Sequence, residues 1–413
     1  MGRCNVSYDF CTNFLSHKTR EFGMTQSPHF RLAGIDSLED FETAMSTVHA
    51  HRDQDIGIFA TALDKRRGAL RDAAFLQLIL TWARLSPRAN IHLLSNTRVP
   101  AGGVIEEACG YSIGIAIMAL AGGVMVNGEA VERALALAPA TDRMEAGYQG
   151  RFDQLMKGRT VDLLVVSGAK RQYVKPLFSG PSPKAIRDKV DLKGTVRALA
   201  TRAASLPSSN LDDATVAALA TLTHELVENM QEHATEDAKG KAYRRHVELV
   251  TASWLTFSEE EAQNDLTANP NLCRYWARHA AIQPGGRKVA GVCFSFLDSG
   301  PGMAARLTGK EIFEISFEEE QFALRECLRL RVTSKKEEGT GGGLEAVLTQ
   351  ISQANGFVRV RSGRQAIFRS FAPGDDPGNV CENFEDWYEG RSELLRVAGT
   401  LISVFIPLPR RAP

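Results

Sequence analysis

The feature that most constrains this chain is an apolar segment that ends in an acidic, glycine-rich turn. Residues 289–297 read VAGVCFSFL, an unbroken apolar run typical of a buried strand. Asp298-Ser-Gly-Pro-Gly302 follows directly. A carboxylate there can accept a hydrogen bond from the amino group of a flat ring, and Gly300 and Gly302 allow close backbone approach. These are also common turn residues, so the motif alone fits an ordinary strand-to-loop turn equally well.

A second motif lies on an expected helix that begins after Asn210, which we predict to be its N-cap. Glu225, Asn229 and His233 recur every fourth residue and border the apolar stripe of this helix. A carboxylate can polarise an attacking water, and an amide oxygen can ligate Mg²⁺ beside phosphate oxygens. Taken alone, the motif is better explained as a solvated polar flank.

A third motif, Gly339-Thr-Gly-Gly-Gly343, opens an expected helix at 344–354 whose natural C-cap is Gly356. Glycines let backbone N–H groups surround an anion, and a helix N-terminus favours negative charge. A flexible glycine hinge is the alternative reading of this motif.

The order of these motifs resembles that of the GHKL, or Bergerat-fold, ATPases, which include gyrase, heat-shock chaperone, histidine-kinase and mismatch-repair ATPases. Glu225-xxx-Asn229 is similar to the N box of that family, Asp298-x-Gly-x-Gly302 to its first glycine box, and 339–344 to its second. The segment 399–407 is similar to the terminal strand of histidine-kinase catalytic domains.

The resemblance implies ATP and Mg²⁺ as ligands and a role for each matching residue. Glu225 would be the general base, Asn229 would hold Mg²⁺, and Asp298 would read adenine. Residues 303–338 would form a charged, irregular lid. The other nucleotide-binding candidates are His233, Gly300, Gly302, Lys335, Gly339, Thr340, Gly341, Gly342, Gly343 and Leu344.

Departures from the family pattern keep the activity open. Gly342 stands where histidine kinases usually have Leu, and the stretch between Asn229 and Asp298 is longer than in compact kinases. No phosphoacceptor-histidine helix precedes the N box. We therefore expect an ATPase that switches a partner or its own assembly. The alternatives are a kinase that phosphorylates a separate protein and a nucleotide sensor that does not hydrolyse ATP.

The rest of the chain predicts a two-domain α/β protein. Apolar strands at 55–63, 90–95 and 161–167 alternate with helical segments, which indicates an α/β layer. We expect a leader at 1–28, an α/β regulatory or partner-binding domain at 29–178 that weakly resembles STAS-like domains, and a helical connector at 179–210. An α/β sandwich with a mixed, mostly antiparallel sheet should occupy 211–409, with a helical insertion at 236–280 and a loop-rich excursion at 364–397.

Composition constrains the expected binding partners and cellular compartment of the protein. Lys plus Arg equals Asp plus Glu, 49 each, so net charge gives no reason to expect a nucleic-acid or membrane surface. The 7 cysteines form no CxxC pair, which favours a reducing, cytoplasmic compartment. The apolar run at 112–126 is interrupted by glycines and predicts a buried helix rather than a membrane span. Expected partners are ATP, an unidentified protein bound by the first domain, and a second copy in a homodimer.

Overall fold

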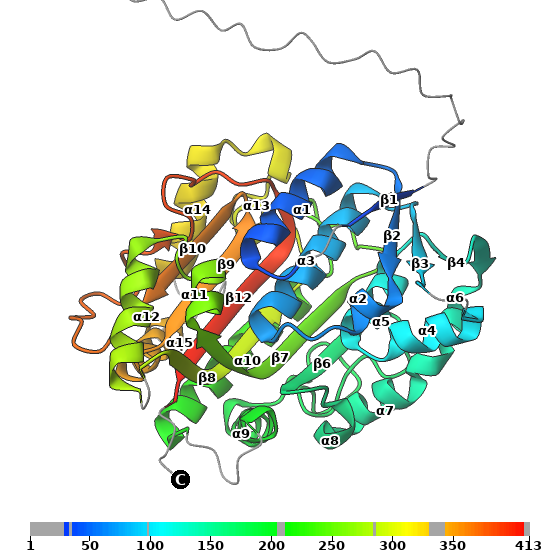
Figure 1. Ribbon diagram of the computed structural model, residues 1–413. Helices are drawn as coiled ribbons and strands as arrows, with labels where there is room; N and C mark the ends of the chain where they lie inside the picture. The colour runs from blue at the N-terminus through cyan, green and yellow to red at the C-terminus, as the bar shows by residue number, and fades with distance from the viewer. Residues whose placement is uncertain are drawn as a thin grey trace, which may run out of the picture.

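The computed structural model describes residues 29–32, 35–96, 99–204, 211–283, 286–329 and 343–408. The chain is a mixed α/β protein built on two sheets that lie side by side (Figure 1). This confirms the predicted fold class.

The first sheet has the order β1-β2-β3-β4-β5; the pairs from β1 to β4 are parallel and β5 pairs antiparallel to β4. Its strands are β1 (His29–Arg31), β2 (Asp55–Phe59), β3 (Asn90–Leu94), β4 (Gly123–Val126) and β5 (Glu129–Val131). The helices of this half are α1 (Leu38–Ala50), α2 (Ala60–Asp64), α3 (Ala69–Leu85), α4 (Ala101–Cys109), α5 (Ser112–Leu120), α6 (Arg133–Leu137), η1 (Ala138–Ala140), α7 (Thr141–Gln149) and α8 (Phe152–Leu155). Parallel pairing is what alternating strands and helices predict.

The second sheet has the order β11-β10-β9-β12-β8-β7-β6, and its pairs are antiparallel. Its strands are β6 (Thr160–Val166), β7 (Val247–Ser258), β8 (Lys288–Leu297), β9 (Phe357–Gly363), β10 (Gln365–Ser370), β11 (Glu385–Asp386) and β12 (Val397–Pro407). The helices of this half are α9 (Lys189–Ala204), α10 (Asp213–His233), α11 (Glu259–Asp265), α12 (Pro270–Ile282), α13 (Met303–Thr308), η2 (Ile312–Glu314), α14 (Phe317–Arg329) and α15 (Gly343–Gln353).

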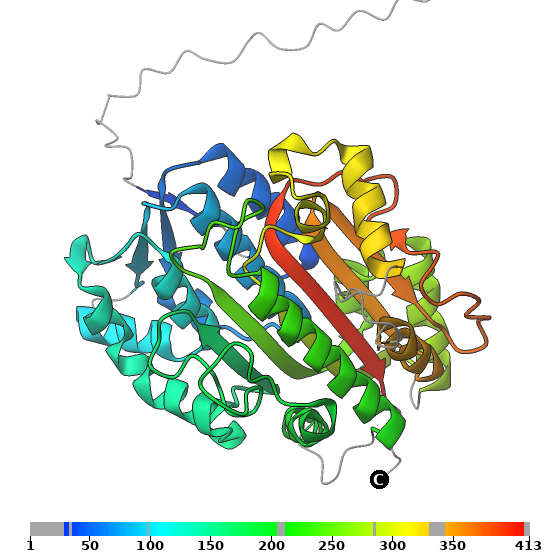
Figure 2. The same cartoon turned by 180° about the vertical axis from the view of Figure 1, so that it is seen from behind.

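Helices cover both faces of the second sheet because successive side chains of its strands point to opposite sides. On β12, Ile402 and Val404 join the apolar core under α9, α10 and α15, the face seen in Figure 2. Leu401 and Phe405 join the core under α3, α11 and α12, the face seen in Figure 1.

Helix α3 ties the two halves together. It is rich in Ala and Leu, which favour helix, and is buried along almost its whole length. On one side Trp82 donates to the carbonyl of Gln54, 3.1 Å away, next to the first sheet. On the other side Gln77 donates to the carbonyl of Arg361 at 3.1 Å, on β9. One apolar core cluster therefore includes residues of both halves.

Several sequence-based expectations need correction. Strand β6, which we grouped with the first domain, pairs with β7 in the second sheet, so the division between the sheets does not follow the expected junction at 178–210. The expected helical insertion at 236–280 contains β7, whose β-branched and aromatic residues favour a strand. The expected irregular segment from 303 contains α13, η2 and α14, the last of which ends at Arg329. The expected excursion at 364–397 begins with β10, which forms a hairpin with β9.

Two cap predictions also change. The N-cap of α10 is Asp212, whose carboxylate accepts from the backbone N–H of Thr215 at 2.6 Å. Asn210 lies outside the described residues. After α15, the left-handed residue is Asn355 at φ 52°, not Gly356. Both positions suit short polar side chains that bond locally.

No single helix within the described ranges is long and apolar enough to cross a membrane. The helices α4 and α5 together reach that length and composition, but the chain bends by 113° between them. Each described residue of α5 is buried in the protein core.

Candidate functional site

The candidate site centres on Asp298, the residue that follows β8. Its Oδ1 accepts hydrogen bonds from the backbone N–H of Gly300 at 2.7 Å and of Thr400 at 3.1 Å. Gly302 has a φ of +91°, a left-handed conformation that favours glycine. The loop is thus held by backbone contacts to β12, a strand that lies far away in sequence but next to β8 in the sheet.

Burial raises the pKa of Asp298 to about 6, although the Gly300 and Thr400 N–H groups and the charge of Arg306 favour the ionised form. Arg306 lies on α13, and burial lowers its pKa to about 10 against the opposing charges of Asp298 and Glu232. A largely enclosed carboxylate and a guanidinium therefore face the same region. They give the site one group that accepts hydrogen bonds and one that can bind an anion.

Gly399 braces the Asp298 loop from β12. Its N–H donates to the carbonyl of Gly300 at 2.9 Å, and its φ is +70°. A Cβ at this position would lie 2.0 Å from the carbonyl oxygen of Asp298. On the other side of the loop, Arg84 of α3 donates to the carbonyl of Ser299 at 2.9 Å, so a helix of the first half helps to hold it.

The C-terminal end of helix α10 packs against this loop. A Cβ on Gly300 would lie 3.0 Å from the Cα of Ala234, at the end of α10. The Nδ2 of Asn229 is buried and has no hydrogen-bond partner among the described residues. Glu225 accepts at Oε1 from the ammonium of Lys189 on α9, 2.6 Å away. The side chain of His233 is not among those described.

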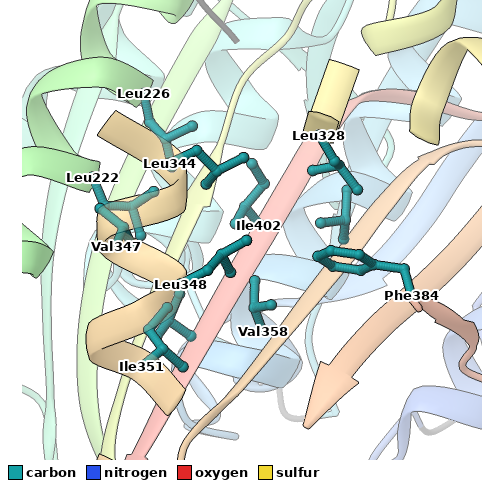
Figure 3. A pocket seen from close by; sticks show the side chains of 12 residues that line it. Leu222, Leu226, Leu328, Leu344, Val347, Leu348, Ile351, Val358, Phe384 and Ile402 are labelled. Carbon is teal, nitrogen blue, oxygen red and sulfur yellow. The ribbon is translucent and has the colours of Figure 1, made fainter. Parts of the chain in front are cut away.

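Helix α15 begins at Gly343 and packs beside α10 on the same face of the sheet (Figure 2). Between α10, α14, α15 and the sheet lies an enclosed cavity of about 20 Å³, shown in Figure 3. Leu344 and Leu226 lie side by side in its wall. A cavity this size holds at most a water, and its apolar lining favours an empty space. It is a packing defect behind the candidate site and not a nucleotide pocket.

The structure thus packs the end of α10, the helix that carries Glu225 and Asn229, against the loop that holds Asp298, Gly300 and Gly302. The remaining predicted residues, Lys335, Gly339, Thr340, Gly341 and Gly342, lie outside the described residues. Two arginines within the expected lid segment, 303–338, have protein partners: Arg325 donates to the carbonyl of Phe384 at 2.8 Å, and Arg329 pairs with Glu326 at 3.1 Å.

Sequence reasoning missed Thr400, Arg306, Lys189 and Glu248 as residues of this region. Thr400 carried a signal, because it is the second residue of the segment 399–407 that resembles the kinase terminal strand. Arg306 is four positions after Gly302 but was read as part of an irregular lid. Lys189 and Glu248 carried no such signal in the sequence. Lys189 contacts Glu225 only because α9 packs on α10. Glu248 lies on β7, in a segment that the sequence predicted to be helical.

Comparisons of this chain with protein-family models, with curated proteins and with solved structures give no match.

Proposed function

We propose that this chain binds an adenine nucleotide with Mg²⁺ between α10, α13 and the Asp298 loop, and hydrolyses its terminal phosphate. The observation that carries the proposal is the Asp298 carboxylate. Two backbone N–H groups hold its Oδ1, so its Oδ2 has a direction set by the sheet. A pre-oriented carboxylate beside a glycine-lined backbone suits the exocyclic amino group of a flat base.

The fit of Mg²⁺ depends on Asn229. One end of its carboxamide, the Nδ2 end, is buried without a hydrogen-bond partner in the described part of the chain. The nitrogen and oxygen of an amide are distinguished only by their partners, so this orphaned end can equally present the oxygen. An amide oxygen and phosphate oxygens are ligands that Mg²⁺ accepts. Asn229 would therefore hold the ion, which would neutralise phosphate charge.

Glu225 lies one helical turn before Asn229 and would orient or deprotonate the attacking water. Lys189 holds one oxygen of this carboxylate, which limits its rotation. The side chain of Glu225 is 15% exposed and that of Lys189 is 44% exposed. Water can therefore solvate the Lys189 ammonium more readily than the Glu225 carboxylate. The N-terminus of α15, at Gly343 and Leu344, would favour the phosphate charge through its helix dipole.

The test compares nucleotide binding and phosphate release by wild type, Asp298→Asn and Glu225→Ala with Mg²⁺. In Asp298→Asn, the amide oxygen of the new side chain can keep both backbone contacts while an NH₂ group replaces the second acceptor oxygen. Loss of a charged hydrogen bond costs about 1.5–3 kcal/mol, so Asp298→Asn should bind roughly 10- to 100-fold more weakly. Glu225→Ala should bind normally and lose about 10²- to 10⁴-fold in turnover. A wild type that binds no adenine nucleotide overturns the proposal.

One observation favours a second candidate, a nucleotide sensor that does not hydrolyse ATP. Glu225 is already engaged by Lys189, an arrangement that also suits a purely structural ion pair. A sensor would bind ATP without releasing phosphate, and Glu225→Ala would leave its cellular activity intact. Phosphate release that disappears in Glu225→Ala would reject this candidate.

The same proposal extends to the cellular compartment and to the part of the chain that binds a partner. We place the activity in the cytoplasm and assign partner binding to the first half of the chain, which α3 connects to the Asp298 loop through Arg84. A nucleotide-dependent change in self-association, measured by light scattering, would identify a homodimer as the output. Transfer of labelled phosphate to a protein, lost in Glu225→Ala, would instead identify a kinase.

A further inference from the structure

A buried polar cluster lies beside Asp298, on the side of β8 that faces β7. The register pairs Leu249 of β7 with Leu297 of β8 in antiparallel orientation, which places Glu248 next to Asp298. Glu248 is 2% exposed, and its Oε2 accepts from the Nε2 of Gln231 at 2.6 Å. The Nε2 of His246, just before β7, lies 4.0 Å from Oε1 of Glu248.

This cluster has unused hydrogen-bonding capacity. Oε1 of Glu248 and both ring nitrogens of His246 are buried, with no hydrogen-bond partner in the part of the chain that the structure describes. Burial, reinforced by the charge of Asp298, raises the pKa of Glu248 to about 8. Burial and the charge of Arg84 lower the pKa of His246 to about 4. At neutral pH, both groups are therefore uncharged.

Glu248 also acts on the helix that carries the candidate catalytic residues. Gln231 follows Asn229 by two positions on α10, so it points to the opposite side of the helix. Its hydrogen bond to Glu248 ties the last turns of α10 to β7. Deprotonation of Glu248 would place two negative carboxylates on neighbouring strands, and one of them would then have to take up a proton or move.

We propose that Glu248 is a positioning residue of the nucleotide site, kept as a neutral acid so that Asp298 remains the charged acceptor for the base. This inference rests on the proposed function and extends it to the control of nucleotide affinity by pH. Glu248 does not touch the nucleotide itself; it acts through Asp298 and through the Gln231 contact to α10.

Among the residues that the structure describes, the groups around Glu248 do not supply an equivalent titration. Gln231 on α10 is uncharged, and His246 has a pKa of about 4. Asp298 after β8 has a pKa of about 6. After β6, Tyr173 has a pKa raised by burial and by the charge of Glu248, so it titrates above its ordinary range. A transition in nucleotide affinity near pH 8 would therefore report Glu248.

The experiment measures the affinity of full-length protein for Mg²⁺–ADP by calorimetry from about pH 6.5 to 9.5, a range that brackets the pKa of Glu248. Wild type should lose about tenfold in affinity for each pH unit above about 8, because one proton must be taken up for binding. Glu248→Gln keeps the hydrogen-bonding partner of Gln231 without a titratable proton. It should match wild type at neutral pH and show no such loss. Asp72→Asn is the matched control, because Asp72 on α3 is also fully buried with a pKa raised to about 7, but it bonds Tyr111 instead of the site.

A second readout does not depend on nucleotide. A carboxyl with a raised pKa in the folded state contributes stability below its unfolded pKa, and that contribution is lost as the pH rises through the folded value. Wild type should therefore lose stability between about pH 4.5 and 8 relative to Glu248→Gln, measured by urea unfolding. If both proteins follow the same stability curve, Glu248 is not a neutral acid and the inference is wrong.

The two proposals fail in different ways. Wild type that binds no Mg²⁺–ADP at any pH overturns the proposed function. Binding with parallel pH profiles in wild type and Glu248→Gln overturns only the role of Glu248. If Glu248→Gln does not fold, Gln231→Leu removes the same hydrogen bond from the α10 side, and its unchanged affinity at neutral pH would equally refute the inference.

Discussion

Replacement of Gly399 by Ala tests how β12 holds the Asp298 loop. Gly399 combines a φ of +70° with a Cβ position only 2.0 Å from the carbonyl oxygen of Asp298. The left-handed conformation costs an L-residue about 1–2 kcal/mol. Relief of the overlap must also separate Gly399 from Gly300 and Thr400 from Asp298, two hydrogen bonds worth about 1 kcal/mol each. We expect a total loss of about 3–4 kcal/mol.

Gly128 offers a matched control for this substitution. It lies in the turn between β4 and β5 at a φ of +86°, and a Cβ there meets nothing within 4 Å. Gly128→Ala should therefore cost only the conformational term of about 1–2 kcal/mol and leave nucleotide affinity unchanged. Urea unfolding gives the two stabilities, and a Mg²⁺–ADP titration gives the affinities. Equal losses in the two variants would refute the bracing role of Gly399.

Three further outcomes follow from individual contacts. Glu42→Ala should cost about 3–5 kcal/mol in urea unfolding, because it leaves Arg361, its bidentate partner at 2.9 and 3.0 Å, as a buried unpaired cation; Glu42→Leu combined with Arg361→Met should recover most of that loss. Lys189→Met should change stability by less than about 1 kcal/mol, because the ammonium is partly solvated, yet lower kcat roughly tenfold at unchanged nucleotide affinity as Glu225 loses its orientation. Leu348→Ala should cost about 2–5 kcal/mol, because it enlarges an existing apolar cavity.

The sequence by itself determined the elements whose signal is local. The apolar run at 289–297 and the turn residues after it predict a strand that ends just before Asp298, and β8 ends at Leu297. The apolar stripe of α10 likewise places Glu225 and Asn229 on its border without any long-range information. Their residue types, the glycines above all, also suggested a nucleotide site, which stays a prediction.

Only the tertiary structure decided what surrounds those residues. Thr400 reaches Asp298 because β12 pairs with β8, and Glu248 lies beside it because β7 pairs with β8 on the other edge. Lys189 meets Glu225 through helix packing. Strand β6 shows the same limit: its apolar sequence predicts a buried strand but not its partner, which is β7. Strand pairing and helix packing bring together residues that are far apart in sequence. Which elements pair depends on the free energy of the whole core, and a short window of sequence does not determine it.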